Sequence, residues 1–139
     1  MEVVSFNHYS GFFRRLLAVI IDHFIIGFLA TVLGLFFHFR IYQEDNFSTY
    51  PIIGIGFFTL LYYVILESSE WQATVGKKLL NMKVTDENFG RISPLKALIR
   101  YLASWLSGTV LFLGYIWVIF DSKKQAWHDK IAGTYVVNI

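Results

Sequence analysis

The sequence predicts an all-α transmembrane helical bundle with a small cytoplasmic β-hairpin or three-stranded sheet. The chain has 139 residues, of which 55% are hydrophobic and 16% charged, whereas a soluble domain has about 25% charged residues. The apolar residues gather into three long blocks, interpreted as two full spans and a third long, broken or re-entrant helical segment. A polar stretch with strand-like alternation separates the second block from the third, and residues 1–139 are expected to form one domain.

The first apolar block covers residues 12–38. Its continuous part, Leu16–Phe37, contains 22 residues and would form a helix roughly 33 Å long, which is enough for one crossing. The residues before it are polar, and no small-residue cleavage pattern follows it. We therefore expect a retained anchor rather than a removed signal peptide.

The second block covers residues 51–71 and follows a polar loop, residues 38–51. Pro51 suits the first turn of a helix, because its missing amide hydrogen is not needed there. Tyr62, Tyr63 and Trp71 lie toward the far end of the block, as aromatic anchors do at a membrane interface. The block is predicted to cross the membrane back to the side where the chain began.

Residues 79–93 are predicted to form a β-hairpin outside the bilayer. The segment LLNMKVTD alternates between apolar and polar residues, and the turn sequence DENFG follows it before the chain returns through RIS. The last segment, residues 133–139, is also strand-like. It would complete a three-stranded sheet, since an isolated hairpin is marginally stable in water.

The third block, residues 94–121, admits two interpretations: one helix of about 27 residues, roughly 40 Å long, or a helical pair broken around residues 107–109. The distribution of lysines and arginines helps to choose between these two topologies. Two precede the continuous apolar run that starts at Leu16, one lies in the first loop, six in the middle and three in the tail. A turn back puts eleven of them on one side and one on the other, whereas a single crossing gives eight and four. The positive-inside rule thus favours the turn and cytoplasmic termini.

Asp22 lies inside the first block, where an ionised carboxylate is costly and usually has a partner. Arg15 shares its helix face, but helical side chains lean toward the N-terminus, so Arg15 leans away from Asp22. Arg100 on the third block is the expected partner instead, and Glu67 is expected to face Arg100 or Arg15. The set serves either proton and cation movement or the stapling of helices. His23 points to another face, where a local hydrogen bond is favoured over titration.

Several classes of function are not supported. The chain has no cysteine, which excludes disulfides, thiolate catalysis and thiol–metal sites. TVGKK lacks the first glycine and the final hydroxyl residue of a phosphate loop, and no metal-binding H-E-x-x-H spacing or Ser-His-Asp set is present. We expect no enzyme activity, cofactor or metal. Nucleic acid is not expected as a partner, because no basic patch lies apart from the membrane segments.

Three ordered motifs resemble the RDD family of small prokaryotic membrane proteins. They are R-x-x-A-x-x-x-D from Arg15 to Asp22, TVGKKLLNMKVTDENFGRISPLKALIR, and WHDKIAGTYVV near the end. The resemblance runs from about Gly11 to Val137. The family is named for one arginine and two aspartates, which implies family roles for Arg15 and Asp22. The second aspartate is either Asp129, which is preferred, or Asp121.

The resemblance implies a multi-pass protein of the inner membrane, in a family where some members are reported as monovalent cation/proton antiporters and most are uncharacterised. On this hypothesis Asp22 exchanges a proton for a cation, and a homo-oligomer is needed to enclose a pathway. The alternative is a non-transporting membrane scaffold, assembly factor, sensor or lipid-binding module that uses the basic cytoplasmic hairpin on anionic headgroups. In that case the Arg/Asp set is a structural lock, and Asp129 holds the turn into the last strand.

Overall fold

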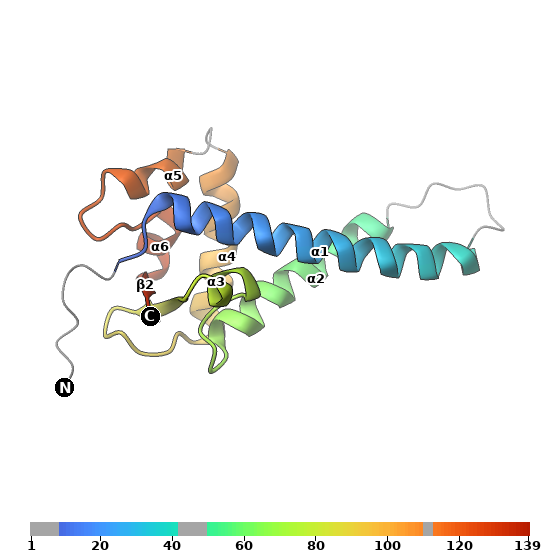
Figure 1. Ribbon diagram of the computed structural model, residues 1–139, viewed down its shortest axis with the longest axis horizontal. Coiled ribbons are helices and arrows are strands. Elements are labelled where there is room, and N and C mark those ends of the chain that lie inside the picture. Colours follow the sequence, from blue (N-terminus) through green and yellow to red (C-terminus); the bar gives the residue numbers. More distant parts are fainter. Residues whose placement is uncertain (1–8, 42–49, 110–112) are drawn as a thin grey trace.

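The computed structural model describes residues 9–41, 50–109 and 113–139 (Figure 1). Helix α1 spans Phe12–Ile41, and α2, Tyr50–Ser68, returns along it toward the same end of the molecule. Most of the polar loop expected at residues 38–51 falls on residues 42–49, which lie outside the described part. The predicted mostly helical architecture is confirmed.

Helix α1 is apolar almost all round, as a helix facing lipid should be. Among the side chains described up to residue 36, one stripe of the helix is buried, formed by Arg15, Ala18, Asp22 and Ile26. Within the described residues, the segment Phe12–Phe36 is the one helix that is long and apolar enough to cross a membrane unaided. The apolar part of α2, Ile53–Ser68, is shorter, and the helices of the third block qualify only if a bent pair is counted as one span.

The sheet has two strands in the described chain, not three. Strand β1, Met82–Asp86, pairs antiparallel with β2, Thr134–Asn138, so that Val84 lies opposite Val136. The predicted hairpin over residues 79–93 is wrong, because residues 91–93 are not a strand and lead directly into the next helix. The free edge of β1 is occupied by Gln72, whose carbonyl accepts from the Val84 amide at 2.6 Å while its side chain donates to the Val84 carbonyl at 3.2 Å.

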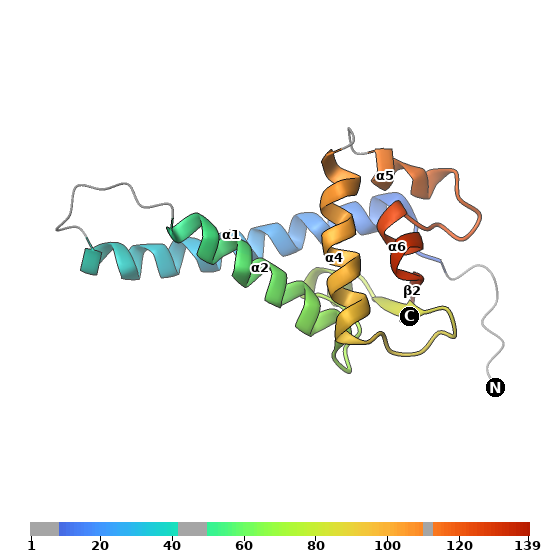
Figure 2. The ribbon, with the colours of Figure 1, turned by 180° about the vertical axis from the view of Figure 1, so that it is seen from behind.

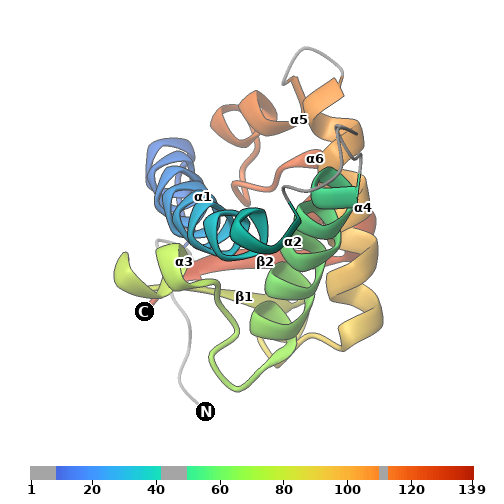
Figure 3. The same ribbon diagram turned by 90° about the vertical axis from the view of Figure 1, so that its right-hand side faces the viewer.

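The third block is broken. Helix α4, Pro94–Thr109, is followed by α5, Leu113–Ile116, and the 3-10 helix η2, Trp117–Ile119. The direction of the chain changes by 112° between α4 and the α5–η2 pair, across residues outside the described part. Figures 1 and 2 show that α4 runs across the α1–α2 pair rather than along it, and Figure 3 shows the same arrangement along α1.

Two short helices were not predicted. Helix α3, Val75–Leu79, packs on α1, and α6, Trp127–Ala132, packs on α4. Gly133 ends α6 in a left-handed conformation (φ 62°), which glycine adopts without steric cost. We refer to α3, β1, α6 and β2 together as the cap region.

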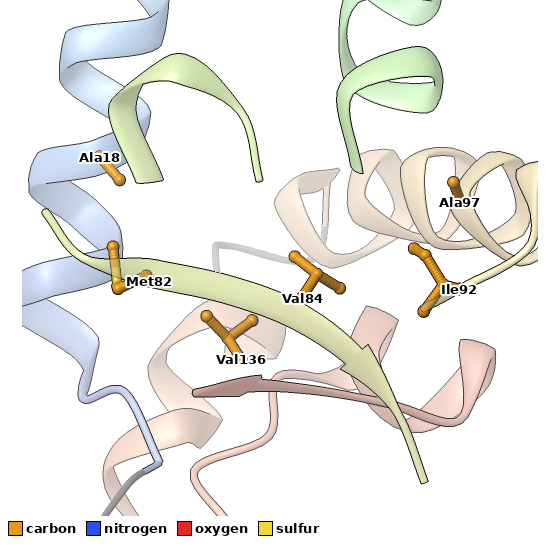
Figure 4. Packing of buried hydrophobic residues seen from close by; sticks show 6 residues of the cluster. All are labelled: Ala18, Met82, Val84, Ile92, Ala97 and Val136. Carbon is orange, nitrogen blue, oxygen red and sulfur yellow. The ribbon is translucent and has the colours of Figure 1, made fainter. Parts of the chain in front are cut away.

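A small apolar core joins the cap region to the helices (Figure 4). Ala18 of α1 and Ala97 of α4 lie near opposite ends of β1 in Figure 4, and small side chains there allow close packing. Its members are Ala18, Met82, Val84, Ile92, Ala97 and Val136. Because six side chains, two of them alanines, bury little apolar area, polar contacts between elements must fix much of the arrangement.

Candidate functional site

A buried network of charged side chains connects five helices. We call it the ion network. No member exposes more than 9% of its surface. Its members alternate in charge along the sequence of contacts and come from α1, α2, α3, α4 and α6: Arg15, Glu67, Lys77, Arg100 and Asp129.

Asp129 joins the two arginines at the centre of the network. Arg100 donates from Nε at 2.9 Å and from Nη2 at 2.7 Å to Asp129 Oδ1, while Arg15 donates to Oδ2. Arg15 also donates to the carbonyls of Ser10, at 3.0 Å, and of Lys124. Burial alone would raise the pKa of Asp129, but the two guanidinium groups hold that pKa far below its usual value. Asp129 is therefore a fixed anion at any physiological pH.

Glu67 carries the network onward from Arg100. Arg100 donates from Nη1 to Glu67 Oε2 at 2.6 Å, and the Lys77 ammonium donates to Oε1. Burial lowers the pKa of Lys77, and the Glu67 carboxylate opposes that shift. Glu67 was expected to face Arg100 or Arg15, and its contact in the structure is with Arg100.

Asp22 belongs to a separate group of contacts. Its carboxylate accepts from the Tyr62 hydroxyl at 2.7 Å, the Thr74 hydroxyl at 2.6 Å and the Gly76 amide at 2.7 Å. Thr74 is the N-cap of α3, and the Gly76 amide is among those at the start of that helix without an intrahelical partner. We call Asp22, Tyr62, Thr74 and Gly76 the carboxylate cap. The expectation that Asp22 faces Arg100 is wrong, because uncharged donors surround its carboxylate.

Gly76 allows α3 to lie directly against α1. A Cβ atom at this position would sit 2.2 Å from the carbonyl oxygen of Ala18 and 3.0 Å from the Asp22 carboxyl carbon. Any side chain would therefore push α3 off α1 and separate Asp22 from its donors. The motif TVGKK thus supplies an N-cap, a close approach and, through Lys77, a member of the ion network. These roles were not predicted from the sequence, although threonine is a favoured N-cap residue and could have marked the start of a helix at position 74.

The two remaining candidates lie outside both groups. Asp121 forms an ion pair with Lys130 at 2.5 Å on the surface, and it also accepts from the backbone amides of Lys123 and Gln125. His23 lies on the exposed side of α1, where its Nδ1 is 2.7 Å from the carbonyl of Val19. Neither side chain is among the described donors to the Asp22 carboxylate. Among the residues that the structure describes, no three histidine, aspartate or glutamate side chains are placed to hold a metal ion.

A cavity of about 290 Å³ lies beside the ion network. Glu67, Lys77 and Arg100 form its charged part, and aromatic rings such as Tyr63 and Tyr115 form much of the remainder. Asp22 is fully buried and is not among the described side chains that line this cavity.

His128 is buried next to Asp129. Its Nε2 lies 3.5 Å from Asp129 Oδ1, and its ring packs on Tyr115 at 5.0 Å between centroids. Its Nδ1 has no hydrogen-bond partner among the described residues. Burial lowers the pKa of His128 to about 3; Asp129 opposes this shift, whereas Arg100, Arg15 and Lys77 add to it. Between about pH 3 and pH 6.5, His128 is therefore neutral in the folded protein but protonated in the unfolded chain.

We expect stability to fall on acidification through the titration of His128. Because its pKa is lowered in the folded state, its contribution is complete above about pH 6.5 and is lost as the pH falls toward 3, with a slope of about 1.4 kcal/mol per pH unit. Thermal unfolding in detergent between pH 4 and 7 measures this slope. His128→Gln should flatten it and His23→Gln should retain it; an unchanged slope in His128→Gln contradicts the assignment.

The fold and the site define a mostly helical, membrane-associated protein with a buried Arg/Asp network. The chain belongs to the RDD family, whose model matches residues 9–133. It is 32% identical over 147 residues to the uncharacterized protein YxaI of Bacillus subtilis, which covers 92% of this chain and 96% of YxaI. No solved structure matches the chain.

Two further relatives are also uncharacterized. The protein YckC of Bacillus subtilis is 26% identical over 132 residues, covering 91% of this chain and 83% of YckC. The protein RP437 of Rickettsia prowazekii is 33% identical over 97 residues, covering 66% of this chain and 54% of its own length. The relatives therefore support the family without assigning an activity.

Proposed function

We propose that this protein is a non-transporting membrane scaffold in which the ion network and the carboxylate cap lock the cap region onto the membrane helices. The observation that carries the proposal is the set of three uncharged donors that hold the Asp22 carboxylate. These donors come from α2 and the start of α3, and Asp22 is fully buried. An exchanging carboxylate must release its partners in turn, whereas these donors hold α3 in place.

Charge balance supports the same proposal. Arg15, Lys77 and Arg100 are matched by the carboxylates of Asp22, Glu67 and Asp129, so the six buried groups sum to zero. Replacing such a set with apolar residues is often neutral for stability, but removing one partner leaves a buried charge uncompensated. A network of this kind favours one arrangement of the elements, which is the property a scaffold requires.

The wider setting of the scaffold follows the distribution of charge. We place the chain in the prokaryotic inner membrane, with α1 and α2 crossing and both termini in the cytoplasm, in agreement with the positive-inside rule. The bilayer is its partner, and it needs neither cofactor nor catalysis. A homo-oligomer is required only by the exchanger hypothesis, in which Asp22 carries a monovalent cation or a proton; that hypothesis stays a prediction.

Reconstitution distinguishes the two functions. Purified protein in proteoliposomes that contain a pH-sensitive dye receives pulses of sodium, lithium or potassium, with a known exchanger reconstituted in parallel. The scaffold proposal predicts no proton movement above that of empty vesicles. Exchange by the wild-type protein that disappears in a folded Asp22→Asn variant overturns the proposal and supports the carrier role of Asp22.

We expect Asp22→Asn to lower the free energy of unfolding by about 1.5–3 kcal/mol, the range for hydrogen bonds to charged groups. The amide retains one acceptor oxygen but turns donor hydrogens toward donors that already point at this site. Thermal or denaturant unfolding in detergent measures the loss. Glu70→Gln, at an exposed turn after α2, is the matched control, and equal stability of the two variants contradicts a locking role for Asp22.

A further inference from the structure

Helix α4 has two sharply different faces. Ala97, Arg100, Ala103 and Ser107 recur at helical spacing and are buried, and Arg100 enters the ion network from this face. The opposite face is apolar and 40–65% exposed. We call it the outer stripe, and it consists of Leu95, Ile99, Leu102, Trp105 and Leu106. A soluble helix would put polar residues on the exposed side, so this pattern is inverted.

The direction of α4 and the two basic residues within it argue against a crossing. It runs across α1 and α2 at the end of the pair that carries the sheet (Figures 1 and 2). Its 16 residues span about 24 Å, less than the ~30 Å of a hydrocarbon core. Lys96 and Arg100 also lie within this length. If α1 is normal to the bilayer, α4 lies close to its plane.

The exposed apolar surface continues beyond α4. The α5–η2 segment and the residue after it expose large apolar side chains: Leu113, Ile116, Trp117, Ile119 and Phe120. The same kind of surface covers α1, where it begins at Phe13 and includes Phe24 and Phe28. The outer stripe therefore has the same apolar, exposed character as the surface of α1. We assign lipid as the environment of both surfaces for this reason.

Tryptophan positions mark the level of the interface. All four tryptophans of the chain, Trp71, Trp105, Trp117 and Trp127, follow α2, and none lies in the first apolar block. Two of them carry a lysine over the ring, Lys78 at 4.6 Å from Trp71 and Lys130 at 5.7 Å from Trp117. Tryptophan with a nearby amine is typical of the headgroup region, where the ring meets acyl chains and the amine meets phosphates.

We infer that α4 and the α5–η2 segment form an in-plane collar that rests in the headgroup–acyl boundary of one leaflet. The outer stripe faces the acyl chains, and the buried face holds Arg100 against Asp129 and Glu67. The collar therefore fixes the depth of the cap region relative to the bilayer. This inference requires α1 to cross the membrane, but it does not depend on whether the protein transports ions.

Spin-label depth measurement tests the collar directly, because the chain has no native cysteine. Nitroxide labels are attached singly at Leu95→Cys, Leu102→Cys and Leu106→Cys in phosphatidylethanolamine/phosphatidylglycerol vesicles, and depth is read from accessibility to oxygen and to a nickel chelate. An in-plane helix puts all three at one shallow depth, about 5–10 Å below the headgroups. A crossing helix instead separates positions 95 and 106 by about 16 Å.

Helix α1 supplies the matched control. Leu17→Cys and Phe28→Cys are exposed positions with the same spacing of eleven residues, and they should differ in depth by about 16 Å if α1 crosses. The collar is overturned if positions 95 and 106 differ as these two do. It is also overturned if label 102 resists both oxygen and the nickel chelate and shows dipolar broadening, since a second copy of the chain would then cover the stripe.

Discussion

Replacing Asp129 with asparagine should lower the free energy of unfolding by about 3–5 kcal/mol, the cost of removing one partner of a buried ion pair. Arg15 and Arg100 both donate to this carboxylate, and both are buried, so two guanidinium charges lose their shared counter-ion. Denaturation of the detergent-solubilised protein, followed by tryptophan fluorescence, measures the difference.

Asp121→Asn is the control for this prediction, and it also separates the two aspartates that the family motif left open. Asp121 pairs with Lys130, whose side chain is 41% exposed, and surface pairs contribute about 1 kcal/mol or less. We therefore expect a small loss at position 121. If Asp121→Asn costs as much stability as Asp129→Asn, the assignment of the structural role to Asp129 is wrong.

The second large effect is expected at Gly76. Gly76→Ala puts a methyl group 2.2 Å from the backbone oxygen of Ala18, and backbone cannot rotate away as a side chain can. Overpacking costs about 1–3 kcal/mol, and the loss should reach or exceed the upper end because α3 also carries donors to Asp22. Thermal unfolding in detergent measures it.

Gly108→Ala in α4 is the matched control. The nearest atom to its added Cβ is on the Tyr115 ring at 3.9 Å, an ordinary contact, and alanine is favoured over glycine within a helix by about 1 kcal/mol. This variant should be as stable as the wild type or slightly more so. A Gly76→Ala protein that unfolds at the wild-type midpoint would contradict the close approach of α3 to α1.

The sequence predicted the parts of the fold that composition controls. The first block was expected at residues 12–38 and α1 spans Phe12–Ile41, because a long apolar run leaves little choice of structure. The strand at residues 133–139 was also found, as β2. The return strand of the hairpin was not, because alternation indicates a strand but does not show that Gln72 occupies its edge.

The site was harder to predict for a different reason. A cation was the expected partner of Asp22, because charged residues can be recognised in a sequence. Its donors in the structure are instead two hydroxyls and one backbone amide. Thr74 and Gly76 lie in a stretch that was interpreted as a poor phosphate loop and as part of a family motif, neither of which points to Asp22. Arg100 was expected to face Asp22, which is wrong, whereas the expected contact of Glu67 with Arg100 or Arg15 is found as Glu67–Arg100. The direction of α4 across α1, which decides between these carboxylates, cannot be read from periodicity.

The order in which the ribosome makes the ion network has a consequence for biogenesis. Asp129 is synthesised 114 residues after Arg15 and 29 after Arg100. Until Asp129 is synthesised, Arg15 and Arg100 lack the carboxylate that joins them. The ion network therefore cannot close around these two arginines before that point. Closure of the ion network by Asp129 is therefore a late step after insertion, and a chain truncated before residue 129 would present the uncompensated charge of Arg15 to proteolytic quality control.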